Sequence, residues 1–192
     1  MIPLIINLPQ SEERRKIIEQ KIKPYFESHI LFEAVDGMRL AEDEYRKHIA
    51  ESLGIPDEKL KPSYFYERKN FQSYGRNEAT IMKKVGCFLS HLNAIRFAVN
   101  NNLFNVLILE DDFILNDNIF TVDINKSSGL ITYFGGQGKG SIPIENNSFI
   151  DLKEFELFGT YGYLIKTKPD MVYIYNLMMS CFNEGQGRIK LK

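Results

Sequence analysis

The sequence predicts an α/β fold, a sandwich in which helices cover a mostly parallel central sheet. Two short apolar runs, Pro3–Leu8 and Asn105–Leu109, have the pattern of strands buried on both faces. Segments with apolar residues at helical spacing alternate with such runs along the chain. We see no internal repeat and no low-complexity linker.

The first strand and the elements after it follow from local signals. After Pro3–Leu8, Ser11 is placed to cap a helix that carries two glutamates in its first turn, and Pro24 marks the end of that helix. A second apolar run, Ile30–Val35, leads directly into the turn pair Asp36-Gly37. The predicted order is therefore strand, helix, strand and turn.

The middle of the chain predicts two helices and a strand. Leu40 to Leu53 has the spacing of one helix, which Gly54 ends. Residues 55–80 have no clear period and are rich in aromatic residues, so we expect a packed irregular insertion. A second helix fits the apolar spacing from Phe88 to Val99, and the strand Asn105–Leu109 follows.

The last third predicts a strand at Leu130–Phe134 and a glycine-rich loop from Gly135 to Gly140. The glycines of that loop suit close approach to a phosphate or a mobile lid, although their spacing is not that of a P-loop. A tyrosine- and glycine-containing segment, Phe158–Ile165, precedes a last helix at Met171–Met179.

Length and composition indicate one globular protein. Of its 192 residues, 44% are hydrophobic and 26% are charged, which is typical of a single domain with a real core. We expect this domain to cover residues 1–185, followed by a basic, loose tail over 186–192. Two cysteines suit a reducing compartment, so both are expected to be free thiols.

Charge and hydropathy exclude other classes. The formal net charge is −1 with scattered basic residues, so no global field attracts nucleic acid or anionic lipid. No apolar run reaches the roughly 18 residues of a membrane span. We therefore expect a cytoplasmic protein or a catalytic piece of a larger one.

Acidic residues follow two predicted strands: Asp36 after the second, and Glu110, Asp111 and Asp112 after Asn105–Leu109. Ligands of parallel sheets gather beyond the carboxyl ends of the strands. Adjacent carboxylates repel one another, and a divalent cation such as Mg²⁺ or Mn²⁺ relieves this repulsion while accepting oxygen ligands. The alternative is a solvated turn, and the apolar strand before the cluster favours the metal site.

Four other polar residues are weaker candidates. Asn7 ends the first strand and Arg14 lies in the first helix, where an amide can contact a base and a guanidinium a diphosphate. Both are also ordinary surface residues. His91 lies on an apolar helix face, which favours a supporting role, and Ser90 has no visible Asp/His relay.

Together these residues resemble glycosyltransferase family 25, the lipopolysaccharide and collagen-type galactosyltransferase group. The resemblance covers most of the chain and is most specific where a Gly-Cys-x-Leu-Ser-His run is followed by Leu-Glu-Asp-Asp. It rests on these segments in order: Ile6–Leu8 with Ser11 and Arg14, Ala34–Gly37, Gly86–Leu92, Leu107–Asp112, Tyr133–Gly136 and Tyr161–Ile165.

The resemblance implies a GT-A-like nucleotide-binding domain that transfers a hexose, commonly galactose, from a nucleotide-sugar such as UDP-galactose to a hydroxyl of a glycan or glycoprotein. It implies that Mn²⁺ or Mg²⁺ is held by Glu110 and Asp112. Its donor-binding residues would be Asn7, Leu8, Arg14, Asp36, Gly37, Ser90, His91 and Asp111.

An inverting enzyme also needs a carboxylate that takes the proton of the acceptor. The family usually has an acid in a Pro-x-Asp-like segment after its last core helix, and this chain lacks that segment. Glu184, which follows the last predicted helix, is the substitute.

Two alternatives stay open. One is a relative of the same fold that binds a nucleotide-sugar without catalysing transfer. The other is a single-strand nucleic-acid binder that uses Tyr64, Tyr66, Arg68 and Lys69 for stacking and phosphate contact. The near-neutral charge counts against the second.

Overall fold

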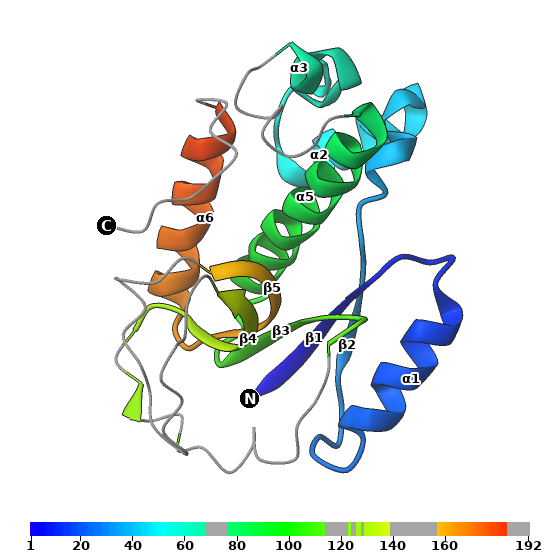
Figure 1. Ribbon diagram of the computed structural model, residues 1–192. Helices are drawn as coiled ribbons and strands as arrows, with labels where there is room; N and C mark the ends of the chain where they lie inside the picture. Colours follow the sequence, from blue (N-terminus) through cyan, green and yellow to red (C-terminus); the bar gives the residue numbers. More distant parts are fainter. Residues whose placement is uncertain (68–76, 114–122, 124–125, 128, 139–156, 184–192) are drawn as a thin grey trace. The chain divides into compact units, whose positions relative to one another are not determined.

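The computed structural model describes residues 1–67, 77–113, 123, 126–127, 129–138 and 157–183 (Figure 1). The chain forms two compact units. The sheet unit consists of Met1–Phe32 and Asn102–Asp170, together with residues 191–192, and the helical unit consists of Glu33–Asn101 and Met171–Lys190. Each unit is described by itself.

The sheet unit contains a five-stranded sheet. Its strands are β1 (Ile2–Asn7), β2 (Ile30–Glu33), β3 (Val106–Glu110), β4 (Thr132–Gly138) and β5 (Leu157–Ile165). Their order in the sheet is β2-β1-β3-β5-β4. β1 and β3 pair in parallel with Ile2 opposite Val106 and Ile6 opposite Glu110. The apolar runs that predicted β1, β2 and β3 therefore do form strands.

The sheet is mixed, so the prediction of a mostly parallel sheet is only partly right. β5 pairs antiparallel with β3 on one side and with β4 on the other. The sequence reasoning missed β5 as a strand because its tyrosines and glycines give no continuous apolar run. Gly162 is needed there, since a Cβ atom at this position would lie 2.5 Å from Cε2 of Phe113 and 2.9 Å from Cδ2 of Leu109.

The predicted glycine-rich loop is wrong over its first four residues. Gly135 to Gly138 belong to β4, where Gly135 pairs with Gly162 and Gly138 with Leu157, with register shifts between them. Pairing with β5 outweighs the low strand propensity of glycine, and the irregular register is typical of glycine in strands. Residues 139 and 140 lie outside the described residues.

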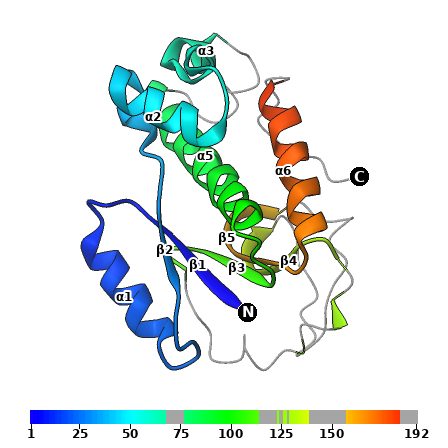
Figure 2. The same cartoon turned by 180° about the vertical axis from the view of Figure 1, so that it is seen from behind.

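The core of the sheet unit lies between the sheet and helix α1 (Glu12–Ile22). Ile18 and Ile22 of α1 are buried against apolar side chains of the strands: Ile5, Leu107, Leu109 and Leu164. Full burial of such a side chain stabilises the fold by about 1.5–3 kcal/mol. Figures 1 and 2 show α1 beside the β1–β2 side of the sheet from opposite directions. This packing fixes the position of α1 relative to the end of β1.

The helical unit contains η1 (Gly37–Ala41), α2 (Asp43–Leu53), η2 (Asp57–Leu60), α3 (Pro62–Tyr66) and α5 (Glu78–Asn100), with α6 (Lys168–Asn183) from residue 171 onward. The helix predicted over 40–53 is thus a 3-10 turn followed by α2, and it ends at Gly54 as expected, with φ of 66°. The insertion predicted as irregular contains η2 and α3, while its residues 68–76 lie outside the described residues.

Helix α5 starts well before the segment that the sequence predicted. Its N-terminus is capped by Asn77, whose side-chain oxygen accepts a hydrogen bond from the backbone N–H of Thr80 at 2.8 Å. An aromatic cluster joins α3, α5 and α6, with Phe182 stacked on Phe88 and on Tyr64. The packing of Tyr64 into this cluster does not favour the nucleic-acid alternative, whose Arg68 and Lys69 lie outside the described residues.

Buried Arg46 connects three elements of the helical unit. Its guanidinium donates to the carbonyl oxygen of Leu40 at 3.2 Å, pairs with Asp43, and lies 3.6 Å from a carboxylate oxygen of Asp57. Hydrogen bonding to Arg46 lowers the pKa of Asp43. A buried charge needs such partners, so Arg46 fixes α2 against η1 and η2.

Both cysteines are free, as predicted, with Cys87 exposed and Cys181 buried. In the part of the chain that the structure describes, no helix has the length and apolar character to cross a membrane.

Candidate functional site at the ends of β1 and β3

Polar residues meet where β1 and β3 end. Because the two strands are parallel and Ile6 lies opposite Glu110, Asn7 at the end of β1 lies beside the acidic cluster that follows β3. The amide nitrogen of Asn7 donates a hydrogen bond of 2.7 Å to Oδ2 of Asp111. The parallel pairing of β1 and β3 thus places Asn7 next to Asp111, a contact that the sequence analysis did not predict.

Asp111 is the fixed member of the cluster. Its Oδ1 atom lies 3.0 Å from Nη1 of Arg14, and its side chain is 9% exposed while that of Arg14 is 48% exposed. Asn7 binds one oxygen and Arg14 the other, so both oxygens of the Asp111 carboxylate have a protein donor. Sequence reasoning named all three residues but did not foresee that they bind one another.

Ser11 differs from its predicted role. It occupies the N-cap position of α1, but its side chain makes no capping hydrogen bond. Its hydroxyl oxygen instead accepts a hydrogen bond of 3.0 Å from Nη2 of Arg14, and its carbonyl oxygen accepts one of 3.2 Å from Asn7. The start of α1 is therefore used to orient the Arg14 guanidinium, which leaves part of its surface exposed.

Asp112 is the exposed member of the cluster, and Glu110 is half-buried. Partial burial of the Asp112 carboxyl group, followed by the negative charges of Glu110 and Asp111, raises the pKa of Asp112, while Arg14 lowers it to a smaller extent. Arg14 therefore offsets only part of the negative charge around Asp112. Carboxylate oxygens such as those of Asp112 fit a divalent cation such as Mg²⁺ or Mn²⁺.

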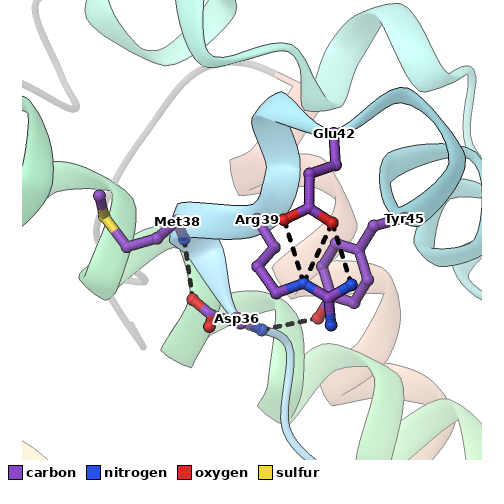
Figure 3. A network of polar contacts seen from close by, with 5 residues as sticks. All are labelled: Asp36, Met38, Arg39, Glu42 and Tyr45. Atoms are coloured by element: carbon purple, nitrogen blue, oxygen red, sulfur yellow. Dashed lines mark hydrogen bonds and ion pairs between the residues drawn. The ribbon is translucent and has the colours of Figure 1, made fainter.

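In the helical unit, Asp36 organises the turn after β2 (Figure 3). Its Oδ1 atom accepts a hydrogen bond of 3.0 Å from the backbone N–H of Met38, which caps η1. Its own backbone N–H donates to the hydroxyl oxygen of Tyr45 at 2.8 Å. Asp36 is half-buried, and the turn predicted for Asp36-Gly37 is present as this 3-10 start.

Arg39 and Glu42 complete this network, and sequence reasoning missed both. The Arg39 guanidinium lies over the ring of Tyr45 at 4.3 Å and forms hydrogen bonds to both carboxylate oxygens of Glu42 (Figure 3). This contact lowers the pKa of Glu42, and burial raises the pKa of Tyr45. The signal available in the sequence was the spacing of three between Arg39 and Glu42.

Gly37 and Gly86 allow η1 and α5 to approach each other closely. A Cβ atom on Gly86 would lie 2.6 Å from both the nitrogen of Gly37 and the carbonyl oxygen of Val35, and one on Gly37 would lie 1.8 Å from the carbonyl oxygen of Met82. Any other residue at either position would force the two segments apart.

Ser90 connects the same segments through its hydroxyl. It accepts a hydrogen bond of 2.8 Å from the N–H of Val35 and donates one of 2.7 Å to the carbonyl oxygen of Gly86. His91, the next residue, is 6% exposed on α5. The structure therefore gives Ser90 a supporting role within the helical unit.

Leu8 is half-buried directly after β1. Glu184, the predicted base, lies outside the described residues.

The fold and the polar cluster define an α/β protein with an acidic site at the carboxyl ends of neighbouring parallel strands. The family model for glycosyltransferase family 25 (LPS biosynthesis protein) matches residues 1–137. The chain belongs to this family, so the predicted family is confirmed, and membership implies that the protein is a glycosyltransferase. The match includes β1, α1, β3 and the acidic cluster. No curated protein matches the chain.

Proposed function

We propose that the chain transfers a hexose, with galactose as the first choice, from a nucleotide-sugar such as UDP-galactose to a hydroxyl of a glycan or glycoprotein. The reaction is metal-dependent and inverting in a GT-A-like domain. The main support for this proposal is that the two aspartates of the acidic cluster have different surroundings. Asp111 is engaged by Arg14 and Asn7, whereas Asp112 is exposed beside it with a raised pKa.

Arg14 is the proposed contact for the donor diphosphate. Its guanidinium is held by Asp111 and Ser11, so its plane is oriented before substrate arrives, and about half of the side chain is exposed. A preoriented guanidinium can bind phosphate oxygens in a bidentate way with little further loss of side-chain entropy. Asn7 holds Asp111 and Ser11 in place and thereby keeps Arg14 in this orientation.

Glu110 and Asp112 would hold the divalent cation, Mn²⁺ or Mg²⁺. When bound, the cation supplies positive charge that stabilises the departing nucleoside diphosphate. Without the cation, the negative charges of Glu110 and Asp111 repel the Asp112 carboxylate. After burial, this repulsion is the next cause of the raised pKa of Asp112.

The remaining donor-binding assignments rest on the family resemblance. They are Leu8 in the sheet unit and Asp36, Gly37 and His91 in the helical unit, while Ser90 supports this site through Val35 and Gly86 rather than by contact with the donor. Asp36 has its backbone fixed by Tyr45, which suits a residue that must present a carboxylate in a defined direction. Glu184 is the proposed base that takes the proton of the acceptor hydroxyl.

The experiment is a thermal-shift screen of nucleotides and nucleotide-sugars, with and without Mn²⁺, followed by a transfer and hydrolysis assay with the best donor. A ligand that binds only the native state raises its melting temperature. We expect UDP with Mn²⁺ to stabilise the protein more than either alone, and UDP-galactose to be hydrolysed or transferred.

Stabilisation without any hydrolysis or transfer would support the inactive relative instead. Stabilisation by a different nucleotide would contradict the choice of donor. Salt-dependent binding of single-stranded oligonucleotides would support the nucleic-acid alternative.

A further inference from the structure

A pocket of about 280 Å³ lies in the helical unit, where the last turns of α2 and α5 meet the first part of α6. Its walls are apolar where Leu53, Val99 and Val172 line it. Arg96, Asn100 and Tyr175 supply its polar groups. No residue assigned above to donor or metal binding lines this pocket.

Arg96 lines the pocket, and its side chain has one buried donor without a partner among the described residues. Its Nη1 atom is buried and has no hydrogen-bond partner among the described residues. The guanidinium lies against Gly54, where a Cβ atom would be 2.8 Å from Nη1 and 3.1 Å from Nη2. Gly54 has φ of 66°, which suits glycine at the end of α2. Its lack of a side chain also leaves room for the Arg96 guanidinium.

Several carbonyl oxygens at the two helix ends accept hydrogen bonds from groups other than Arg96. At the end of α2, the carbonyl oxygens of Ala50 and Glu51 accept from Gly54, and that of Leu53 accepts from the Tyr175 hydroxyl at 3.3 Å. At the end of α5, the carbonyl oxygens of Phe97 and Val99 accept from the N–H of Asn101. A buried donor without a partner is unfavourable, and an anionic ligand in the pocket can pair with the Arg96 guanidinium where that side chain lines it.

The chemistry of the walls selects the ligand. Among the described residues that line the pocket, Arg96 alone is charged. The pocket can therefore neutralise one negative charge of a ligand but not two. A guanidinium fits a carboxylate in a planar, bidentate geometry, and the apolar walls suit a small aliphatic or ring body. The volume is below the roughly 300 Å³ at which sites for larger ligands begin.

We propose that this pocket binds a small monocarboxylate, with its carboxylate on Arg96 and its body against Val99 and Val172. The role is independent of the transferase site, because it uses none of that site's residues.

Ligand-observed NMR on the full chain tests the proposal with four probes. Isobutyrate and its neutral isostere isobutyramide isolate the charge, glucuronate tests a sugar acid, and inorganic phosphate tests a simple oxyanion. We expect isobutyrate or glucuronate to bind and isobutyramide to bind at least about ten-fold more weakly, as the loss of one charged hydrogen-bonded contact predicts.

Two variants locate the binding. Arg96→Gln removes the charge, and Val172→Glu places a competing carboxylate on the pocket wall, so both should lose acid binding by about ten-fold or more. Arg15→Gln is the matched control, since Arg15 is also a half-buried helical arginine but lies in the sheet unit, and it should bind the acids like the unchanged chain. Val172→Glu keeps the test valid if Arg96→Gln does not fold, because Val172 is exposed.

Binding of the acids that survives both pocket variants would overturn the proposal. So would equal binding of isobutyrate and isobutyramide, or phosphate binding as strong as that of the acids. Absence of binding by every probe would overturn it as well.

Discussion

Arg14 and Asp111 form an ion pair of 3.0 Å that joins the first turn of α1 to the end of β3. The pair has an exposed cation and a nearly buried anion, with side chains 48% and 9% exposed. Because Asp111 also accepts a hydrogen bond from Asn7, its position depends on both strands of the parallel pair. Arg14, the proposed donor-binding residue, is thus held by the same edge of the sheet that carries the proposed metal-binding carboxylates.

The first prediction concerns this arginine. Arg14→Ala should raise the KM for the donor by about ten-fold, the usual loss for one charge-assisted contact to a phosphate, with little change in the KM for the acceptor. Steady-state kinetics with each substrate varied in turn measures the difference. Arg15→Ala is the control, since it removes the neighbouring arginine of the same helix. Equal effects on donor and acceptor would assign Arg14 a structural role.

The second prediction concerns Asp112, whose pKa is raised in the folded protein. A group with a raised folded-state pKa adds stability below its unfolded pKa and loses that contribution as the pH rises through its folded-state pKa. At neutral pH and without divalent cations, Asp112→Asn should therefore raise the melting temperature. We expect the melting temperature to rise by only about 1–2 °C, because solvent partly screens the charge of this exposed carboxylate.

The same variant should lose the stabilisation that Mn²⁺ gives to the nucleotide complex, since a ligand charge is removed while the shape is kept. Glu44→Gln, which neutralises an exposed carboxylate on α2, serves as the control. Melting curves with chelator and with Mn²⁺, recorded at acidic and neutral pH, measure both effects. An unchanged Mn²⁺ dependence in Asp112→Asn would remove this residue from the metal site.

The third prediction separates support from substrate contact at Ser90. Its hydroxyl bonds both Val35 and Gly86 within the helical unit. Ser90→Ala leaves the buried N–H of Val35 unpaired and should lower the free energy of unfolding by about 1–3 kcal/mol. Urea denaturation measures this loss, with Ser63→Ala at an exposed position as the control. The KM for the donor, measured on folded protein, should change less than about three-fold, which is under 1 kcal/mol. A large change in KM at unchanged stability would instead mean that Ser90 contacts the donor.

The site was predictable to the extent that it depends on local pattern. A continuous apolar run marks β1 and β3, and the polar residues that follow them were identified for that reason. The ion pair of Arg14 with Asp111 was not predictable, because it depends on where α1 packs on the sheet. That position is set by the burial of Ile18 and Ile22, which is a tertiary contact.

The antiparallel pairing of β5 was not predictable for a similar reason. A strand between two others takes its direction from the chain connections and from packing, and no residue pattern within β5 encodes it. Gly162 is an example, since its lack of a side chain matters only because Phe113 and Leu109 lie against it. The close approach of Gly37 and Gly86 is likewise a contact between segments far apart in the sequence.

The last prediction concerns the proposed base, Glu184, which lies outside the described residues. An inverting transferase needs a carboxylate to accept the proton of the attacking hydroxyl, and loss of a general base typically lowers turnover by about 10²-fold or more. Glu184→Gln keeps the size and polarity of the side chain and removes only its basicity. We therefore expect kcat to fall by about 10²-fold at an unchanged affinity for the donor. Initial-rate measurements give kcat, and titration of UDP in the presence of Mn²⁺ gives the donor affinity. Gln186→Asn, a conservative change two positions further on, should leave both unchanged. If kcat survives in Glu184→Gln, another carboxylate acts as the base, and the exposed acids of the described residues become the next variants to test.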